Sequence, residues 1–208
     1  MKEIVFVDID TQYDFMAPQG RLYVKGAKDI VPRLKQLTGI AQENGILIIS
    51  SADTHIKNDP EFKQFPAHCV ADSSGQKKIP QTLCKRRIVI SQRIMGKKEL
   101  FNKARGCEQL ILQKNTYDIF VNHNLLRVLK PFHTAFVYGV ALDYCIRYAV
   151  LGLLQAGLRV ELVTDATVAV GAKEGKRLLG RFKDNAVALI KTKEALSAVR
   201  RYAKTGKA

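Results

Sequence analysis

The sequence predicts an α/β fold in which a mostly parallel, doubly wound sheet is flanked by helices. Short apolar runs alternate with helical patterns over the whole length, which is typical of successive βαβ units. The chain has 208 residues, 47% of them hydrophobic and 25% charged, and this is the composition of a globular protein. No internal repeat, low-complexity segment or linker divides it. We therefore expect a single domain over residues 1–208.

The expected strands are short apolar runs that end in polar residues. The first covers residues 4–9 and the second residues 46–49. After the second run comes a polar stretch, residues 50–78, which we expect to be one long functional loop. The other expected strands are residues 87–91, 110–112, 135–138, 159–163 and 186–190.

Helical patterns fill the segments between these strands. After the first strand, apolar residues recur at helical spacing from Ile30 to Ala41, and Gly45 marks the end of this helix. A second clear pattern ends at Gly157, and Asp143 is its candidate N-terminal cap. The later helices expected are residues 143–156, 172–182 and 193–202.

The excess of basic residues gives a formal net charge of +15. Eleven Lys or Arg stand against three acids in the last 38 residues, but there they alternate with Leu178, Leu179 and Phe182, as on the solvated face of an amphipathic helix. No aromatic and basic interleaving and no Cys/His finger accompanies the charge. The pattern favours a solvated basic surface, and a nucleic-acid-binding protein remains the third interpretation.

The sequence also predicts a cytoplasmic protein. The apolar run at the N-terminus is too short for a signal peptide, and no run of about 18 apolar residues predicts a membrane span. The four cysteines, at positions 69, 84, 107 and 145, include no Cys-x-x-Cys pair, so we expect free thiols. A homo-oligomer remains open.

Chemically active side chains follow four of the expected strands. Asp10 follows the first strand, Asp53 and His55 the second, Lys114 the run at 110–112, and Cys145 the run at 135–138. The carboxyl ends of parallel strands meet at one edge of the sheet, where ligands bind. A lysine and a cysteine at this edge indicate nucleophilic catalysis.

Cys145 has a physical reason to be reactive because it lies at the expected start of a helix, whose positive end stabilises a thiolate. A carboxylate such as Asp10 could take the thiol proton, and Lys114 could stabilise the anion. Asp8 lies two residues away on the same face of the strand, so spacing does not choose between the two aspartates. A packed Cys145 with a solvated Lys114 is the alternative.

The polar loop offers a set of metal ligands. Asp53, His55 and His68 combine a carboxylate with two imidazoles, a set that suits zinc, iron or manganese, and Glu61 could be a fourth ligand or hold a bound water. A capping aspartate beside surface histidines is the alternative. We expect Cys69 to pack and assign no role to these remaining candidates: Cys84, Cys107, His123, His133 and the basic run from Lys77 and Lys78 to Arg87, which we expect on the surface.

Several of these motifs, in order, resemble the cysteine hydrolases of the isochorismatase-like superfamily and, within it, the nicotinamidase branch. The matching motifs are D-x-Q-x-D-F at residues 10–15, Lys114 and G-V-A-x-D-x-C at residues 139–145. D-x-H at residues 53–55 and F-P-x-H-C-V at residues 65–70 resemble the nicotinamidase metal loop. The resemblance runs from about residue 7 through residue 169 and implies the isochorismatase-like hydrolase fold.

The resemblance implies an amide hydrolysis that proceeds through a thioester on Cys145. It selects Asp10 as the base beside Lys114, and reads Asp14 as a supporting residue. It places the oxyanion donors at Ala141 and Cys145, with a cis peptide bond between Val140 and Ala141. In this branch a divalent metal, zinc or else iron or manganese, orients a pyridine ring, and the apolar walls would be Phe15 and Phe65.

Two substitutions depart from the family pattern: Phe65 stands where many nicotinamidases have Trp, and Glu61 where some have a third His. The segment after Lys114 is shorter than usual and resembles that of other superfamily members. Because of the metal loop, the first interpretation is a nicotinamidase that forms nicotinate and ammonia in NAD salvage. The second is a related hydrolase of another small amide, carbamoyl or isochorismate-like substrate.

Overall fold

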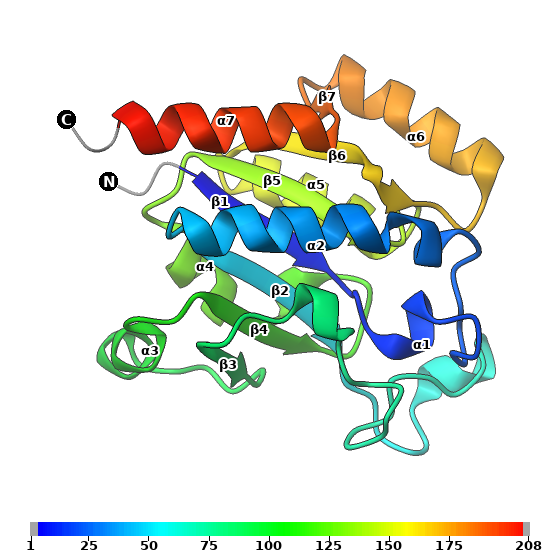
Figure 1. The fold of residues 1–208 in the computed structure, drawn as a ribbon. Coiled ribbons are helices and arrows are strands. Elements are labelled where there is room, and N and C mark those ends of the chain that lie inside the picture. Colours follow the sequence, from blue (N-terminus) through cyan, green and yellow to red (C-terminus); the bar gives the residue numbers. More distant parts are fainter. Residues whose placement is uncertain (1–3, 206–208) are drawn as a thin grey trace.

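The computed structural model describes residues 4–205, and these form a seven-stranded parallel sheet with helices on both faces (Figure 1). The strand order is β3-β4-β2-β1-β5-β6-β7, and every neighbouring pair is parallel. The predicted fold class is therefore confirmed. The strands are β1 (Ile4–Ile9), β2 (Ile48–Asp53), β3 (Arg87–Ile90), β4 (Gln109–Lys114), β5 (Thr134–Val140), β6 (Arg159–Val168) and β7 (Ala188–Ile190).

Helices α2 and α7 cover one face of the sheet, and α5 covers the other (Figure 1). The α-helices are α1 (Tyr13–Met16), α2 (Ala27–Glu43), α3 (Lys97–Ala104), α4 (Asn124–Leu129), α5 (Cys145–Gln155), α6 (Ala172–Asp184) and α7 (Thr192–Thr205). Three short 3₁₀ helices are η1 (Pro60–Lys63), η2 (Pro80–Thr82) and η3 (Ile119–Val121).

The core has two parts because side chains alternate across each strand. In β1, Val5 and Val7 pack with Ile146 of α5, whereas Phe6 packs with Leu34 of α2 and with Val199 of α7. A sheet covered on both faces needs apolar side chains on both sides, which explains the nearly continuous apolar runs of the central strands.

Two local predictions are wrong. Residues 50–53 belong to β2 and not to the loop, because Ser50 and Ser51 are buried and their hydroxyls donate to aspartates of β1 or just beyond it. Asp143 does not cap α5. Its carboxylate instead accepts from the N–H groups of Val170, at 2.9 Å, and Gly171, at 2.7 Å, beyond the end of β6. The short helices α1, α3 and α4 were not predicted.

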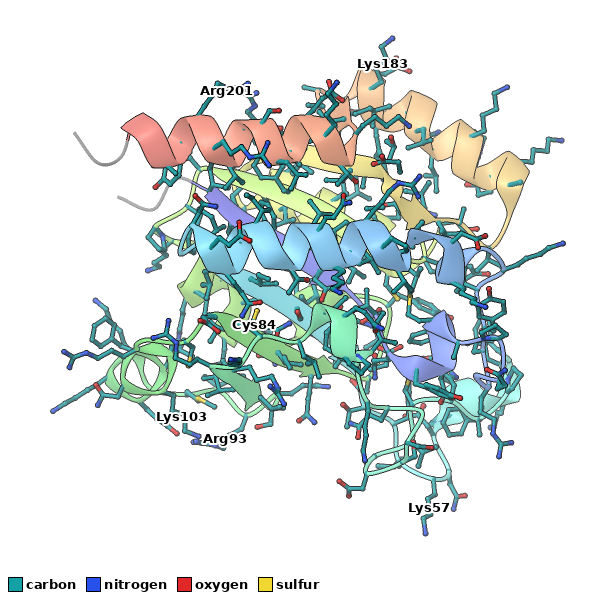
Figure 2. The ribbon with its side chains drawn as sticks, viewed as in Figure 1. Lys57, Cys84, Arg93, Lys103, Lys183 and Arg201 are labelled. Carbon is teal, nitrogen blue, oxygen red and sulfur yellow. The ribbon has the colours of Figure 1, made fainter. Side chains whose placement is uncertain are left out.

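Much of the excess positive charge lies in side chains on the outside of the molecule. Lys57, Lys103 and Lys183 are exposed and extend away from the ribbon, whereas Cys84 lies in the interior (Figure 2). None of the helices within residues 4–205 has the length and apolar character needed to cross a bilayer. The extension of one domain over residues 1–208 stays a prediction, since residues 1–3 and 206–208 lie outside the described part.

The end of β5 requires a glycine. Gly139 has φ +117°, and a Cβ there would lie 2.1 Å from the carbonyl oxygen of Ile9. We expect Gly139→Ala to lower the free energy of unfolding by about 2–4 kcal/mol, because it adds backbone strain to a steric clash.

Gly180 is the matched control, since it is exposed inside α6 and a Cβ there meets no atom within 4 Å. Gly180→Ala should raise stability by about 0.5–1 kcal/mol through helix propensity. Urea unfolding measures both variants, and equal effects would contradict the strain assigned to Gly139.

Candidate active site

Four predicted residues meet at the carboxyl edge of the sheet. Asp10 follows β1, Asp53 ends β2, Lys114 ends β4, and Cys145 is the first residue of α5 after β5. The four strands are consecutive in the sheet, so their ends bring these side chains together. One oxygen of each carboxylate and the sulfur of Cys145 lie within 4.8 Å of one another.

The ammonium group of Lys114 is the centre of this cluster and is fully buried. Its Nζ lies 2.9 Å from Oδ2 of Asp10 and 3.6 Å from Sγ of Cys145. The same nitrogen donates to Oδ1 of Asp53 and, at 2.9 Å, to the carbonyl oxygen of Thr116. This burial contradicts the alternative in which Lys114 is solvated.

The pKa values follow from burial and from this central charge. Burial raises the pKa of Asp10 despite the opposing effect of Lys114. For Lys114, burial opposes the charged form, but the two carboxylates outweigh it and the pKa is raised well above its usual value. Burial also raises the pKa of Cys145 well above that of a free thiol. The resting site therefore holds a neutral thiol beside a charged lysine, and activation requires a proton acceptor.

Ser51 and Gln12 hold the two carboxylates in place. The Ser51 hydroxyl donates to Oδ1 of Asp10 at 2.6 Å and accepts from the Asp10 N–H at 3.1 Å. The Gln12 side chain bonds to both the N–H and the carbonyl of Asp53, at 2.7 and 2.8 Å. Sequence reasoning missed Ser51, although the two serines directly after the apolar run at 46–49 were a visible signal.

Asp53, His55 and His68 form a second cluster in which the ligand atoms lie within 4.8 Å of one another. Oδ2 of Asp53 is 3.8 Å from Nε2 of His55 and 4.0 Å from Nε2 of His68. Oε1 of Glu61 lies 3.9 Å from Nε2 of His68. All three residues of the cluster are buried, which contradicts the alternative of surface histidines.

The donor set fits a divalent transition metal. Nε2 of His55 is buried without a hydrogen-bond partner, although it faces the other ligand atoms. Oδ2 of Asp59 lies 3.0 Å from Nδ1 of His55, and Nδ1 of His68 is hydrogen-bonded to the carbonyl of Pro66 at 2.8 Å. Such partners orient imidazole ligands in metal sites. Sequence reasoning did not single out Asp59.

The reactive groups open into a small cavity of about 120 Å³. Phe15 and Phe65 contribute to its walls as expected, and the Phe15 ring lies 5.4 Å from that of His68. Tyr117 and Tyr144, which were not predicted, line the same space, and their ring centroids are 5.6 Å apart. The remaining lining residues are Asp10, Leu22, Tyr23, Val24, Asp53, Glu61, His68, Val140, Ala141, Cys145 and Val170.

Two backbone donors lie beside Cys145. The peptide bond between Val140 and Ala141 is cis, as the resemblance implies. Within the described residues, the N–H groups of Ala141 and Cys145 donate no hydrogen bond. Since both residues line the cavity, these donors are available to an anionic oxygen there.

Asp8 and Asp10 do not share a face, contrary to the expectation from spacing. Asp10 has φ +49°, which ends the alternation of β1 and directs its carboxylate to Ser51 and Lys114. Asp8 instead lies 3.0 Å from Nζ of Lys78. The surface position expected for Lys78 is also wrong, because this lysine is buried and donates to Thr11 Oγ1 at 2.8 Å.

The remaining candidates are structural. Asp14 stabilises the loop next to His68, since its carboxylate accepts hydrogen bonds from the N–H of Cys69 at 2.7 Å and of Arg21 at 3.0 Å. Cys69 is buried in the core as expected. Burial raises the pKa of Cys84 to about 12, so this thiol is unreactive near neutral pH.

Known proteins share this architecture. Residues 97–194 match the isochorismatase domain family. A nicotinamidase of Escherichia coli (strain K12) is 26% identical in an alignment 177 residues long that covers 76% of this chain and 79% of that protein. A pyrazinamidase of Pyrococcus horikoshii, solved in complex with zinc, has a TM-score of 0.76 and 24% identity over 91% of this chain and 99% of that one. An isochorismatase-like hydrolase from Alkaliphilus metalliredigens has a TM-score of 0.77 and 18% identity over 94% and 98% of the two chains.

The doubly wound sheet brings a cysteine beside a buried lysine at its carboxyl edge, an arrangement typical of enzymes that work through a nucleophile. The matched isochorismatase domain model covers residues 97–194, and the fold of the chain is that of the solved pyrazinamidase and isochorismatase-like hydrolase.

The buried pair of Asp8 and Lys78 can be tested by a double-mutant cycle. Lys78→Met leaves the Asp8 carboxylate buried without its cation, so we expect it to lower the free energy of unfolding by about 3–5 kcal/mol. The double variant with Asp8→Asn should lose less than the sum of the two single losses. Urea unfolding of the four proteins measures this coupling, and additive losses would refute it.

Proposed function

We propose that this chain is a metal-dependent nicotinamidase that hydrolyses nicotinamide to nicotinate and ammonia. One observation carries the proposal: buried Lys114 joins the cysteine and base to Asp53, which also belongs to the cluster of metal ligands. The cavity supports a small substrate, since its 120 Å³ is far below the roughly 300–1,000 Å³ of pockets for drug-sized ligands. The nicotinamidase and pyrazinamidase relatives support the choice of an aromatic amide.

In the first half of the reaction, Asp10 accepts the proton of the Cys145 thiol while the sulfur attacks the carboxamide carbon. The N–H groups of Ala141 and Cys145 donate to the oxyanion of the tetrahedral intermediate. Asp10 then returns the proton to the leaving nitrogen, and ammonia departs as the carbon–nitrogen bond breaks. A thioester between Cys145 and the acyl group remains.

In the second half, Asp10 takes a proton from water while the water oxygen attacks the thioester carbon. The same two N–H groups hold the new oxyanion. When the carbon–sulfur bond breaks, the proton held by Asp10 returns to the Cys145 sulfur and the acid is released. Lys114 stays charged throughout and keeps Asp10 aligned with the sulfur.

Asp53, His55 and His68 would hold the metal, with Glu61 as a further ligand or as the partner of a bound water. A bound metal would act as a Lewis acid toward the pyridine nitrogen and so help to orient the ring. Phe15 and Phe65 would confine the ring between apolar walls. Zinc is our first choice, with iron and manganese compatible with the same ligands. NAD salvage, a cytoplasmic location and a homo-oligomer stay predictions.

Ammonia release from a panel of small amides tests the proposal. We expect nicotinamide to be the best substrate and Cys145→Ala to lower kcat by roughly 10⁴-fold or more, because it removes the nucleophile. Cys84→Ala and Cys107→Ala are the controls and should keep most of the activity. A carbamoyl or aliphatic amide that outperforms nicotinamide would instead establish the related hydrolase.

Metal content gives a separate test. The purified protein should hold about one equivalent of metal by elemental analysis, and a strong chelator should remove the activity. His68→Ala should lower the metal content while the circular dichroism spectrum stays unchanged, because the ligand is lost and the fold remains. His133→Ala is the control, since His133 is exposed and far from the cluster in sequence. A fully active protein without metal would contradict the nicotinamidase assignment.

The pH profile tests Asp10 as the base. Activity needs the ionised carboxylate, so kcat/KM should fall as pH drops through the pKa of Asp10, which burial places above the ordinary value of 3.8. Ser51→Ala removes a hydrogen bond that favours the ionised form, and the acid limb should move to higher pH by about one unit. An unmoved acid limb would show that another group controls it.

A further inference from the structure

A second and larger cavity of about 1,000 Å³ lies at the opposite, amino edge of the sheet. Its lining includes the residues that directly precede three strands: Leu47 before β2, Arg86 before β3 and Glu108 before β4. The catalytic cluster lies where β1, β2 and β4 end, so none of its residues lines this cavity. The two sites are therefore separated by the length of the strands.

Helix α3 forms one wall of the cavity and buries little of its own surface. Among the eight residues of this helix, Leu100 is the buried one, while Phe101 is 66% exposed. In Figure 1, α3 lies to the side of the sheet near β3. The space left between α3, α4 and the strand starts is lined by an apolar set comprising Ala41, Ile46, Leu47, Leu100, Phe101, Ala104, Cys107, Leu110, Val128, Pro131 and Phe132.

The rim of this cavity is basic. Its one carboxylate among the described lining residues, Glu108, is already bonded to Arg86 at 3.2 Å and to Gln42 at 3.3 Å. The basic lining side chains are Arg86, Lys97, Lys98, Arg105, Arg127 and Lys130. Within residues 4–205, the side chains of four of them form no hydrogen bond or ion pair, namely Lys97, Lys98, Arg105 and Lys130.

We propose that this cavity binds a long-chain carboxylate, with the chain on the apolar lining and the carboxylate among the free lysines. An uncharged apolar ligand would gain nothing from the basic rim, and a small hydrophilic anion would leave the apolar lining in water. A second copy of this chain fits poorly, because a two-fold interface places the same basic side chains against each other. The volume is that of a small-molecule pocket.

Calorimetric titration with dodecanoate, kept below its micelle concentration, tests the proposal on the full chain. We expect one binding site per chain. Ala104→Phe should weaken binding, because the added ring occupies part of the space next to the apolar lining. Lys98→Glu combined with Lys130→Glu should raise the Kd about tenfold or more, because both side chains are exposed on the rim and reversing them repels the carboxylate.

Lys103→Glu is the matched control. The substitution changes the net charge of α3 by the same amount as Lys98→Glu. Lys103 itself extends away from the ribbon and does not line the cavity (Figure 2). Its Kd should stay within about twofold of the parent protein. Absence of binding, equal weakening by Lys103→Glu, equal affinity for dodecyltrimethylammonium, or displacement of dodecanoate by a short DNA duplex would each overturn the proposal.

Discussion

The charge of one buried lysine organises the catalytic edge of this protein. An ammonium group without water is stable only when anionic oxygens replace the lost hydration, and Lys114 has two carboxylates for this purpose. The strand order supplies both. β4 pairs with β2 so that Asp53 lies directly beside Lys114, and Asp10 follows from β1, one strand further. A different strand order would leave the lysine without its two carboxylates and the thiol without a neighbouring carboxylate.

Because Asp53 contacts Lys114 with one oxygen and faces the histidines with the other, the proposed metal site and the proposed base are electrostatically linked. Lys114 lowers the pKa of Asp53 against the effect of burial, so this carboxylate is anionic and ready to act as a ligand. The same lysine limits the rise in the pKa of Asp10. One buried cation thus influences the protonation of both halves of the site.

The parts of the site that could be predicted from sequence are those that depend on neighbouring residues in the chain. Asp10, Asp53, Lys114 and Cys145 each follow an apolar run, and the parallel topology is enough to bring strand ends together. The missed parts depend on distant partners. Lys78 is buried because it forms a hydrogen bond with Thr11 and an ion pair with Asp8, residues that lie about 70 positions away in the chain. A lysine in a basic run carries no sign of such partners.

The two aspartates near the end of β1 show how one change in backbone conformation places neighbouring carboxylates on opposite faces of the sheet. Alternation would place both carboxylates on the side of α2, where Phe6 lies and where Asp8 contacts Ser50 and Lys78. The positive φ of Asp10 redirects its side chain to the side of Leu112 and Cys145. Asp8 then stabilises the turn after β1 by accepting a hydrogen bond from the Thr11 hydroxyl, while Asp10 faces the thiol. The ion pair of Asp8 and Lys78 therefore holds the segment that positions Asp10, the proposed base, and its burial helps to keep the arrangement of side chains at this edge of the sheet.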